Sequence, residues 1–331
     1  MTIMHKSTAY SLDIDLLRSV FGDRLAENVA LAPYTSARVG GPADVFVVAR
    51  SAGELGQTVI RLWAAEIPYL VLGGGSNVLV SDAGVRGVVV YNQARRVRFE
   101  GDPETPTVWA ESGANFGRLA RQAAIRGLSG LEWAAGIPGT VGGAVVGNAG
   151  AHGGDVAGSL LMAEILHRDI SGDPQDDLAW TADSEPRFRQ ARWPVDRFRY
   201  AYRTSVLKSR PLAAVVLSAS FRLERSTTEV VSARMDEFRS YRRGTQPPGA
   251  SMGSMFKNPP GDYAGRLIQA AELKGKRIGE VEISPLHANF FINHGGATAQ
   301  DVLNLIRMAQ DEVENKFGTR LELEIHLVGQ W

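Results

Sequence analysis

The chain has 331 residues, of which 44% are hydrophobic and 22% charged, and its formal net charge is zero. This length exceeds what one ordinary hydrophobic core holds, and the composition is typical of a globular protein, so two or three domains are expected. The balanced charge gives no indication of a nucleic-acid partner or of binding to a membrane surface.

The chain contains no cysteine, and this limits its chemistry. Disulfides, thiolate nucleophiles and cysteine-bound iron–sulfur clusters are excluded, so redox chemistry would need a bound organic cofactor or a metal. The six histidines follow none of the usual metal-ligand spacings, and no metal is expected. The first 25 residues lack the apolar stretch of a signal peptide, and no apolar run approaches the roughly 20 residues of a membrane span. We therefore expect a cytoplasmic protein.

Helical and strand patterns alternate along the chain and predict an α+β or α/β protein. Ser51 and Glu54 form a capping-box pattern that predicts a helix to about Ala65. A further helix is expected over 115–126, with Gly127 as the residue that ends it. Strands are predicted over 69–72, 78–80 and 85–91.

The second half of the chain begins with a polar, charged stretch over 169–197 that predicts an exposed excursion, followed by a strand over 213–223. Ser226 and Glu229 form a second capping box for a helix to about 243, and we place the main domain boundary near 225. The first region, 1–224, is expected to split into two subdomains near 90–105. The elements expected beyond the boundary are a helix over 264–273, a strand over 288–292, a helix opened by Thr298 and Asp301, and a strand over 321–328.

Two glycine-rich loops indicate close approach of the backbone to a ligand. Residues 73–77 join two predicted strands and lack the third glycine and helix start of a Rossmann fingerprint. Their N–H groups suit an anion, and Ser76 and Asn77 add side-chain hydrogen bonds, with a plain hairpin turn as the alternative. A second loop over 135–143 makes an extended ligand with a diphosphate and a flat ring system the better interpretation. FAD is the natural candidate.

The candidate polar residues leave the function open by themselves. Ser254 follows Gly253 without the G-x-S-x-G pattern of a hydrolase, and a turn serine is the alternative. Lys257 and Asn258 are typical of a grip on phosphate or substrate. Arg203 taken alone would be a surface arginine. Alternation over 321–328 places Glu322, Glu324 and His326 on one face, which an amphipathic strand in water would also show.

Seven motifs occur in the order found in the UDP-N-acetylenolpyruvoylglucosamine reductase family, and the chain resembles that family from about Tyr34 to Gly329. They are GGPAD (40–44), LGGGSN (72–77), GLEWAAGIPG (130–139), YRTS (202–205), GSMFKNP (253–259), HANF (287–290) and LELE (321–324). The resemblance implies a vanillyl-alcohol-oxidase-type FAD-binding domain with two α/β subdomains over 1–224. A smaller α+β substrate-binding domain over 225–331 would follow it.

The resemblance also implies the reaction and its residues. UDP-N-acetylglucosamine enolpyruvate would be reduced to UDP-N-acetylmuramate by NADPH through non-covalently bound FAD, in peptidoglycan precursor synthesis. The implied catalytic residues are Ser254, Arg203 and Glu324. The implied FAD-binding residues are Gly41, Gly73, Gly74, Gly75, Ser76, Asn77, Gly136, Ile137, Gly139, Thr140 and Gly142. The implied substrate-binding residues are Tyr202, Lys257, Asn258, His287 and Asn289.

The short spacing between Arg203 and Ser254 resembles the subclass of this family without an extra tyrosine-bearing loop. His326 stands where an arginine is common in the family, and His152 stands where a tyrosine often occurs. Two other readings are a flavin oxidase of the same fold, which would use oxygen and lack the Ser254, Arg203 and Glu324 set, and a nucleotide-sugar-binding regulator without flavin.

Overall fold

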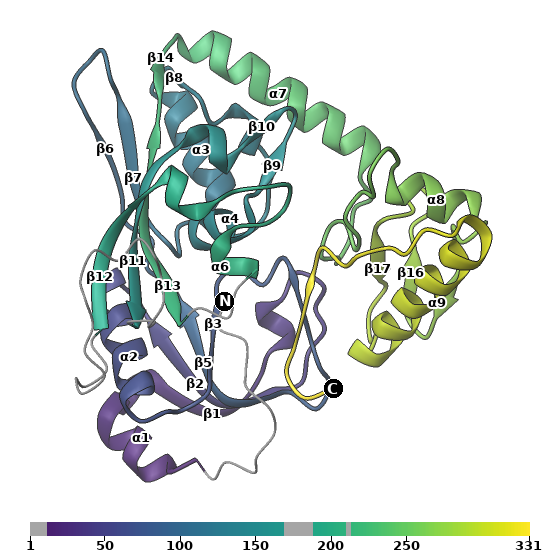
Figure 1. Ribbon diagram of the computed structural model, residues 1–331, viewed down its shortest axis with the longest axis horizontal. Helices are drawn as coiled ribbons and strands as arrows, with labels where there is room; N and C mark the ends of the chain where they lie inside the picture. The colour runs from purple at the N-terminus through teal and green to yellow at the C-terminus, as the bar shows by residue number, and fades with distance from the viewer. Residues whose placement is uncertain (1–11, 169–187, 210–212) are drawn as a thin grey trace. The chain divides into compact units, whose positions relative to one another are not determined.

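The structure is a computed structural model that describes residues 12–168, 188–209 and 213–331 (Figure 1). Helices and strands alternate along the chain, which confirms the predicted mixture of α and β structure. No helix within these ranges combines the length and the apolar character that crossing a membrane requires.

The chain divides into two compact units that are interleaved along the sequence. The first unit takes the described residues of Met1–Val20, Val47–Gly73 and Val90–Met235, and the second takes Phe21–Phe46, Gly74–Val89 and Asp236–Trp331. The domain boundary expected near residue 225 stays a prediction.

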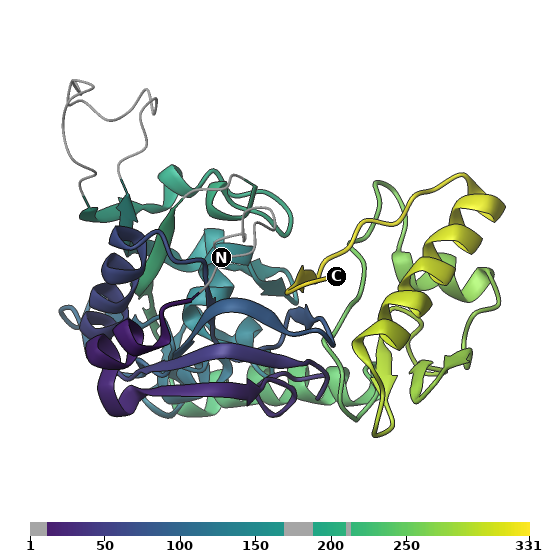
Figure 2. The same ribbon diagram turned by 90° about the horizontal axis from the view of Figure 1, so that it is seen from below.

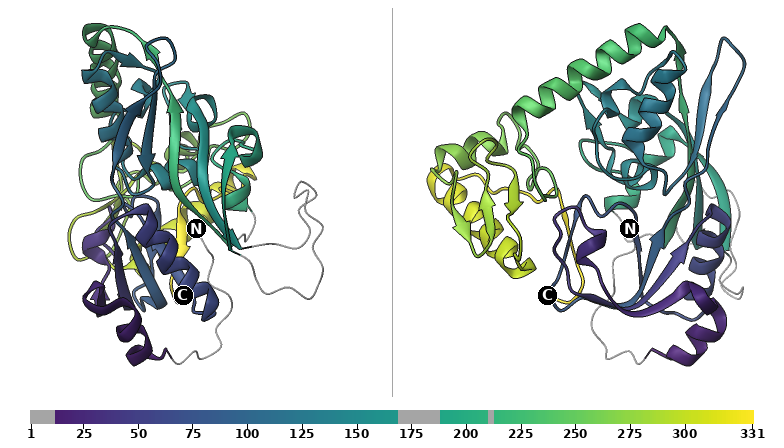
Figure 3. Two further views of the ribbon diagram at one scale, coloured as in Figure 1. Left: turned by 90° about the vertical axis from the view of Figure 1, so that its left-hand side faces the viewer. Right: turned by 180° about the vertical axis from the view of Figure 1, so that it is seen from behind.

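The largest sheet of the first unit has five strands in the order β12-β11-β13-β7-β6, and each neighbouring pair is antiparallel (Figure 3). The strands are β6 (Val97–Glu100), β7 (Thr107–Glu111), β11 (Leu160–Arg168), β12 (Phe188–Pro194) and β13 (Ala214–Arg222). Strand β13 confirms the strand expected over 213–223.

Strand β12 overturns part of the excursion expected over 169–197. Residues 188–194 pair with β11, and a 3-10 helix, η4 (Val195–Phe198), follows directly. The side chains of Trp193 and Phe198 are buried, so this part of the chain belongs to the packed unit despite its polar composition. Residues 169–187 lie outside the described residues.

Two helices of the first unit begin where the sequence predicted, each directly after a residue that caps it. Helix α2 (Ala52–Ala64) follows Ser51, whose hydroxyl accepts from the N–H of Glu54 at 3.1 Å. The Glu54 carboxylate accepts from the N–H of Arg50 at 2.8 Å, one residue before the position a capping box uses. Helix α3 (Phe116–Ile125) is capped by Asn115 and is followed by Gly127 at a φ of +65°, as expected.

The remaining elements of the first unit are shorter. They are α1 (Ile14–Phe21), β3 (Tyr69–Leu72), β8 (Leu128–Ser129), η3 (Glu132–Ala134), α4 (Val141–Gly147), β9 (Gly150–Ala151), β10 (Gly154–Asp155), α5 (Val156–Ser159), α6 (Val206–Ser209) and β14 (Glu224–Arg225). Helix α7 (Thr228–Thr245) carries the chain from the first unit into the second. Its first-turn N–H at Val230 bonds to the hydroxyl of Thr227, so Thr227 takes the capping role expected of Ser226.

A four-stranded sheet has the order β1-β2-β5-β3, with β1 (Leu25–Ala30), β2 (Pro42–Ala49) and β5 (Val85–Asn92). The 3-10 helices η1 (Gly22–Arg24) and η2 (Ala32–Tyr34) flank β1. Strands β3 and β5 confirm the predictions over 69–72 and 85–91.

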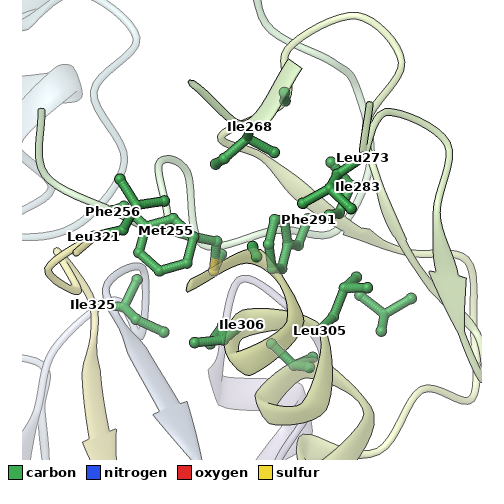
Figure 4. Close-up of a cluster of buried hydrophobic side chains, with 14 of the residues drawn as sticks. Met255, Phe256, Ile268, Leu273, Ile283, Phe291, Leu305, Ile306, Leu321 and Ile325 are labelled. Atoms are coloured by element: carbon green, nitrogen blue, oxygen red, sulfur yellow. The ribbon is translucent and has the colours of Figure 1, made fainter. Parts of the chain in front are cut away.

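In the second unit, helix α9 (Ala299–Phe317) packs against α8 (Ala264–Ala270) and against a three-stranded sheet (Figure 2). The sheet has the order β15-β16-β17, with β15 (Arg277–Ile278), β16 (Val281–Ile283) and β17 (Phe291–Asn293). The strand expected over 288–292 is therefore shorter and begins at Phe291. Figure 4 shows the core of this unit, in which the neighbouring residues Met255 and Phe256 meet Ile306 and Ile325 from two other segments.

The last predicted strand, over 321–328, is wrong for its first five residues. Only β18 (His326–Val328) is a strand, and it pairs in parallel with β4 (Val78–Val80). Leu323 makes a single bridge to Phe256, and the chain then bends at Glu324 and Ile325. The bend breaks the alternation that placed Glu322, Glu324 and His326 on one face.

Asp82, two residues after the end of β4, caps helix α9 from a distant part of the sequence. Its two carboxylate oxygens accept from the N–H groups of Ala299 at 2.7 Å and Gln300 at 2.9 Å. The predicted capping box of Thr298 and Asp301 is confirmed at the same helix end. A carboxylate there satisfies first-turn N–H groups and interacts favourably with the helix dipole.

Replacing Asp82 by alanine should lower the free energy of unfolding by about 1–2 kcal/mol, because two first-turn N–H groups lose their charged acceptor. The measurement is urea denaturation followed by circular dichroism. Asp311→Ala, at an exposed position inside α9, is the matched control and should change stability by less than about 0.5 kcal/mol. Equal losses in the two variants would contradict the capping role of Asp82.

Candidate active site

In the second unit, Ser254 and Glu324 lie on neighbouring segments that are joined through Met255. The N–H of Met255 donates to the main-chain oxygen of Asn289 at 2.8 Å, and the oxygen of Met255 accepts from the N–H of Glu324 at 2.8 Å. Bridges between Ser254 and Phe290, and between Phe256 and Leu323, extend this pairing. The segment that carries Ser254 is thus held between two others, and the fold brings two of the three predicted catalytic residues together.

The side-chain amide of Asn289 bonds to the main chain of Phe256 in the way that a neighbouring strand would. Its Oδ1 accepts from the N–H of Phe256 at 3.0 Å, and its Nδ2 donates to the oxygen of Phe256 at 2.8 Å. The residue is only 3% exposed. This contact fixes the residue two positions after Ser254 and was not predicted from the sequence. The predicted contact of Asn289 with substrate stays a prediction.

Lys257 and Asn258 continue the same segment toward the surface. Nζ of Lys257 lies 3.1 Å from the carboxylate of Glu322, and the N–H of Lys257 donates to the main-chain oxygen of Glu322 at 2.9 Å. The Oδ1 of Asn258, which is exposed, accepts from the N–H of Ala264 at the start of α8. An exposed ion pair of this kind is worth about 0–1 kcal/mol, so a phosphate can compete with Glu322 for Lys257.

His287 is half-buried next to the same segment. Its Nδ1 accepts from the N–H of Asn289 at 3.2 Å, and its ring lies 4.9 Å from the ring of Phe290, between centroids. Burial lowers the pKa of His287 from its usual value of 6.5, and the positive charge of Lys274 lowers it further, against a backbone hydrogen bond that raises it.

The loop over 73–77 carries main-chain donors suited to an anion. The N–H groups of Gly74, Gly75 and Ser76 have no hydrogen-bond acceptor among the described residues. Gly75 has a φ of +60°, and a Cβ there would lie 2.1 Å from the main-chain oxygen of Tyr34, so this position requires glycine. The loop is not a hairpin turn, because β3 and β4 belong to different sheets. Successive unpaired N–H groups of this kind fit a diphosphate.

Gly41 has a structural reason for being glycine. A Cβ there would lie 2.0 Å from the main-chain oxygen of Asp82, and the N–H of Gly41 donates to the oxygen of Ser81 at 2.9 Å. Its predicted contact with the cofactor is independent of this packing and stays a prediction.

In the first unit, the second glycine-rich loop leads into helix α4. Thr140 is its N-cap residue, and the N–H of Gly142 donates to the oxygen of Ser112 at 2.7 Å. The N–H groups of Gly139 and Thr140 have no acceptor in the part of the chain that the structure describes. Gly136 is exposed and Ile137 half-buried, so this loop also presents main-chain groups for a ligand.

Arg203 lies at the tip of a two-residue turn in the first unit. Ala201 and Thr204 close the turn with two main-chain hydrogen bonds of 3.2 and 3.1 Å, which leaves Tyr202 and Arg203 between them. Arg203 has a φ of +55°, a left-handed conformation that costs a non-glycine residue about 1–2 kcal/mol. Its guanidinium carbon lies 5.6 Å from the centroid of the Tyr202 ring.

The turn is anchored to the carboxyl end of helix α4. Nδ2 of Asn148 donates to the oxygen of Ala201 at 3.1 Å, and the hydroxyl of Ser205 donates to the oxygen of Val146 at 2.6 Å. The turn that carries Arg203 is therefore fixed to helix α4 at two points. Asn148 was not predicted from the sequence. The signal that could have found it is an asparagine directly after a glycine-rich helix, because asparagine tolerates the left-handed conformation that ends many helices.

The unpaired main-chain N–H groups of the two glycine-rich loops fit a ligand with a diphosphate, and the chain falls in the class of FAD-binding proteins. A family model described as an FAD binding domain matches residues 43–167. A second family model, the C-terminal domain of UDP-N-acetylenolpyruvoylglucosamine reductase, matches residues 246–328.

The UDP-N-acetylenolpyruvoylglucosamine reductase of Chloroflexus aggregans is 41% identical to the chain over 310 residues, which are 92% of this chain and 97% of that protein. That of Rubrobacter xylanophilus is 42% identical over 302 residues, 91% and 94% of the two chains. The crystal structure of the enzyme from Thermus caldophilus superposes with a TM-score of 0.70 at 35% identity and covers 91% of this chain and 97% of its own. The chain belongs to the UDP-N-acetylenolpyruvoylglucosamine reductase family. It is an FAD-dependent oxidoreductase, and the predicted flavin-binding fold with a further C-terminal domain is confirmed.

The lowered pKa of His287 predicts a loss of stability in acid. The folded state disfavours the imidazolium form, so unfolding takes up a proton, and the free energy of unfolding should fall as the pH drops below about 6.5. His287→Gln should lose less stability between pH 7 and pH 5 than the wild type does, measured by urea denaturation at each pH. Identical pH dependence of the wild type and His287→Gln would contradict the assignment.

Proposed function

We propose that Ser254, Arg203 and Glu324 carry the reduction of the enolpyruvyl group of UDP-N-acetylglucosamine enolpyruvate by this chain. The reaction of the family forms UDP-N-acetylmuramate with NADPH as hydride donor, in peptidoglycan precursor synthesis, and it is the reaction of this chain. The observation that best supports the residue roles is the main-chain pairing through Met255, which places Ser254 and Glu324 on neighbouring segments.

The residues proposed to hold FAD fit the group. The main-chain N–H groups of the loop over 73–77 suit its diphosphate, because those of Gly74, Gly75 and Ser76 have no acceptor in the described ranges. FAD held by these residues would supply the hydride-transfer chemistry between NADPH and the double bond of the substrate. The proposed FAD-binding residues are Gly41, Gly73, Gly74, Gly75, Ser76, Asn77, Gly136, Ile137, Gly139, Thr140 and Gly142.

Arg203 is proposed to stabilise the charge that develops on the substrate. Addition of hydride to the terminal carbon leaves negative charge on the neighbouring carbon and in the carboxylate. A guanidinium binds a carboxylate through two parallel N–H bonds, and a donor placed on such a charge is worth about 3–4 kcal/mol. Glu324 acts on the same charge, either as a neutral acid that donates a hydrogen bond or as a carboxylate that orients Arg203.

Ser254 is proposed to donate the proton that completes the reduction. A hydroxyl is a weak acid, but the carbon that takes the proton is a strong base while it carries the charge. The pairing of Met255 on both sides holds Ser254 in place for this transfer. The residues proposed to bind the rest of the substrate are Tyr202, Lys257, Asn258, His287 and Asn289, with Lys257 on the diphosphate.

Anaerobic flavin spectroscopy tests the function as a whole. NADPH should bleach the flavin absorbance of the purified protein, and UDP-N-acetylglucosamine enolpyruvate should then restore it within the time of one turnover. Bleaching that is reversed only by oxygen would replace this function with that of an oxidase, and a purified protein without flavin would favour a nucleotide-sugar-binding regulator.

Replacing Ser254 by alanine should leave the bleaching by NADPH intact and slow the recovery by substrate at least 100-fold, because general acid catalysis contributes about 10²–10⁴-fold. Stopped-flow absorbance measures both steps. Ser251→Ala, three residues earlier on the same segment, should recover at close to the wild-type rate. Normal recovery in Ser254→Ala would remove Ser254 from the mechanism.

Arg203→Lys should slow the recovery at least 100-fold, because lysine cannot form the two parallel bonds and a lost transition-state donor costs about 10²–10³-fold. Arg199→Lys provides the matched control, since Arg199 is an exposed arginine of the same loop with a φ of +46°. If both lysine variants recover at the wild-type rate, Arg203 is a surface residue only.

A further inference from the structure

Asn77, the last residue of the first glycine-rich loop, contacts the segment that carries Glu324 in two ways. Its Nδ2 donates to the main-chain oxygen of Glu324 at 3.2 Å, and its main-chain oxygen accepts from the N–H of His326 at 3.0 Å. The acceptor at Glu324 is a carbonyl oxygen, so the amide must present its NH₂ group there. Asn77 therefore holds the chain on both sides of Ile325.

The bend at Glu324 and Ile325 explains why the main-chain oxygen of Glu324 bonds to a side chain, that of Asn77, and not to a main-chain N–H of a paired strand. The parallel ladder between β4 and β18 begins with Val78 opposite His326, and the chain before it does not continue as a strand. A polar main-chain group that leaves a ladder still needs a partner. The side chain of Asn77 supplies the donor that a further strand residue would have supplied.

Glu324 is held on its other side by Met255. The N–H of Glu324 donates to the oxygen of Met255, the residue next to Ser254, while the oxygen of Glu324 accepts from Asn77. The peptide groups before and after the Cα of Glu324 are both fixed in this way. Because the two peptide planes determine the direction of the Cα–Cβ bond, they also determine where the carboxyl side chain starts.

We propose that Asn77 is a positioning residue for Glu324, which couples the loop that holds FAD to the residue that acts on the substrate. The proposal rests on the proposed role of Glu324. The loop then has two separate roles. The N–H groups of Gly74, Gly75 and Ser76 bind the anion, and the side chain of Asn77 bonds to the segment that carries Glu324. Asn77 then belongs to the proposed FAD site through its main chain only, because its side-chain amide, which the loop sequence suggested would bond to the anion, bonds to Glu324 instead.

Asn77→Asp tests the proposal because it keeps the shape of the side chain and replaces the donor with an oxygen that repels the carbonyl of Glu324. The dissociation constant of FAD, from fluorescence titration of the apoprotein, should change less than threefold. The recovery of flavin absorbance by substrate should slow at least tenfold, while the bleaching by NADPH keeps its rate. Asn77→Ala removes the donor without adding charge and should show the same pattern. It provides the test if Asn77→Asp does not fold.

Ser76→Ala is the control with the opposite pattern, because it removes the hydroxyl expected to hydrogen-bond to the anion. FAD should bind more weakly, and the recovery per bound flavin should slow less than in Asn77→Ala. A double variant supplies a readout that a purely structural role would not move. If Asn77 acts through Glu324, adding Asn77→Ala to Glu324→Gln should slow the recovery no further than Glu324→Gln alone.

Additive losses in the double variant, or a loss of FAD affinity in Asn77→Ala that accounts for its slower recovery, would overturn the positioning role and leave the proposed function intact. A wild-type protein that is bleached by NADPH but does not recover with substrate would overturn the proposed function and this inference with it.

Discussion

The candidate site of the second unit depends on main-chain pairing of a single short segment. Met255 bonds to Asn289 on one side and to Glu324 on the other, and the residues around it extend both contacts. Met255 and Phe256 are also fully buried in the core of this unit. Since the same two residues fill the core and hold the site, packing energy and site geometry cannot be changed separately here.

The elements predicted best from the sequence are those with local signals. Helices α2, α3 and α9 begin directly after Ser51, Asn115 and Thr298, because a capping side chain and the N–H that it satisfies lie within three residues of each other. The strand expected over 321–328 failed for the opposite reason. Its alternation was a local pattern, but Phe256 and Asn77, far away in the chain, determine where the backbone bends.

The identity of the candidate residues followed from motifs in a characteristic order, whereas the way they are held did not. Asn289 and Asn77 both bond through a side-chain amide to main-chain atoms of residues remote in sequence. Such contacts leave no periodicity and no spacing, because main-chain partners are the same for every residue type. The carboxylate of Asp82, which accepts from the first N–H of α9, is another side chain that bonds to a main-chain group remote in sequence.

The parallel pairing of β4 with β18 has a consequence for synthesis of the protein. Residue 78 pairs with residue 326, so β4 leaves the ribosome long before its partner strand exists. An unpaired strand edge is a template for strands of other molecules, and nascent multidomain chains are exposed to such misassembly. The edge of β4 therefore stays without this partner until residues 326–328 have been made, which covers most of the synthesis between the two strands.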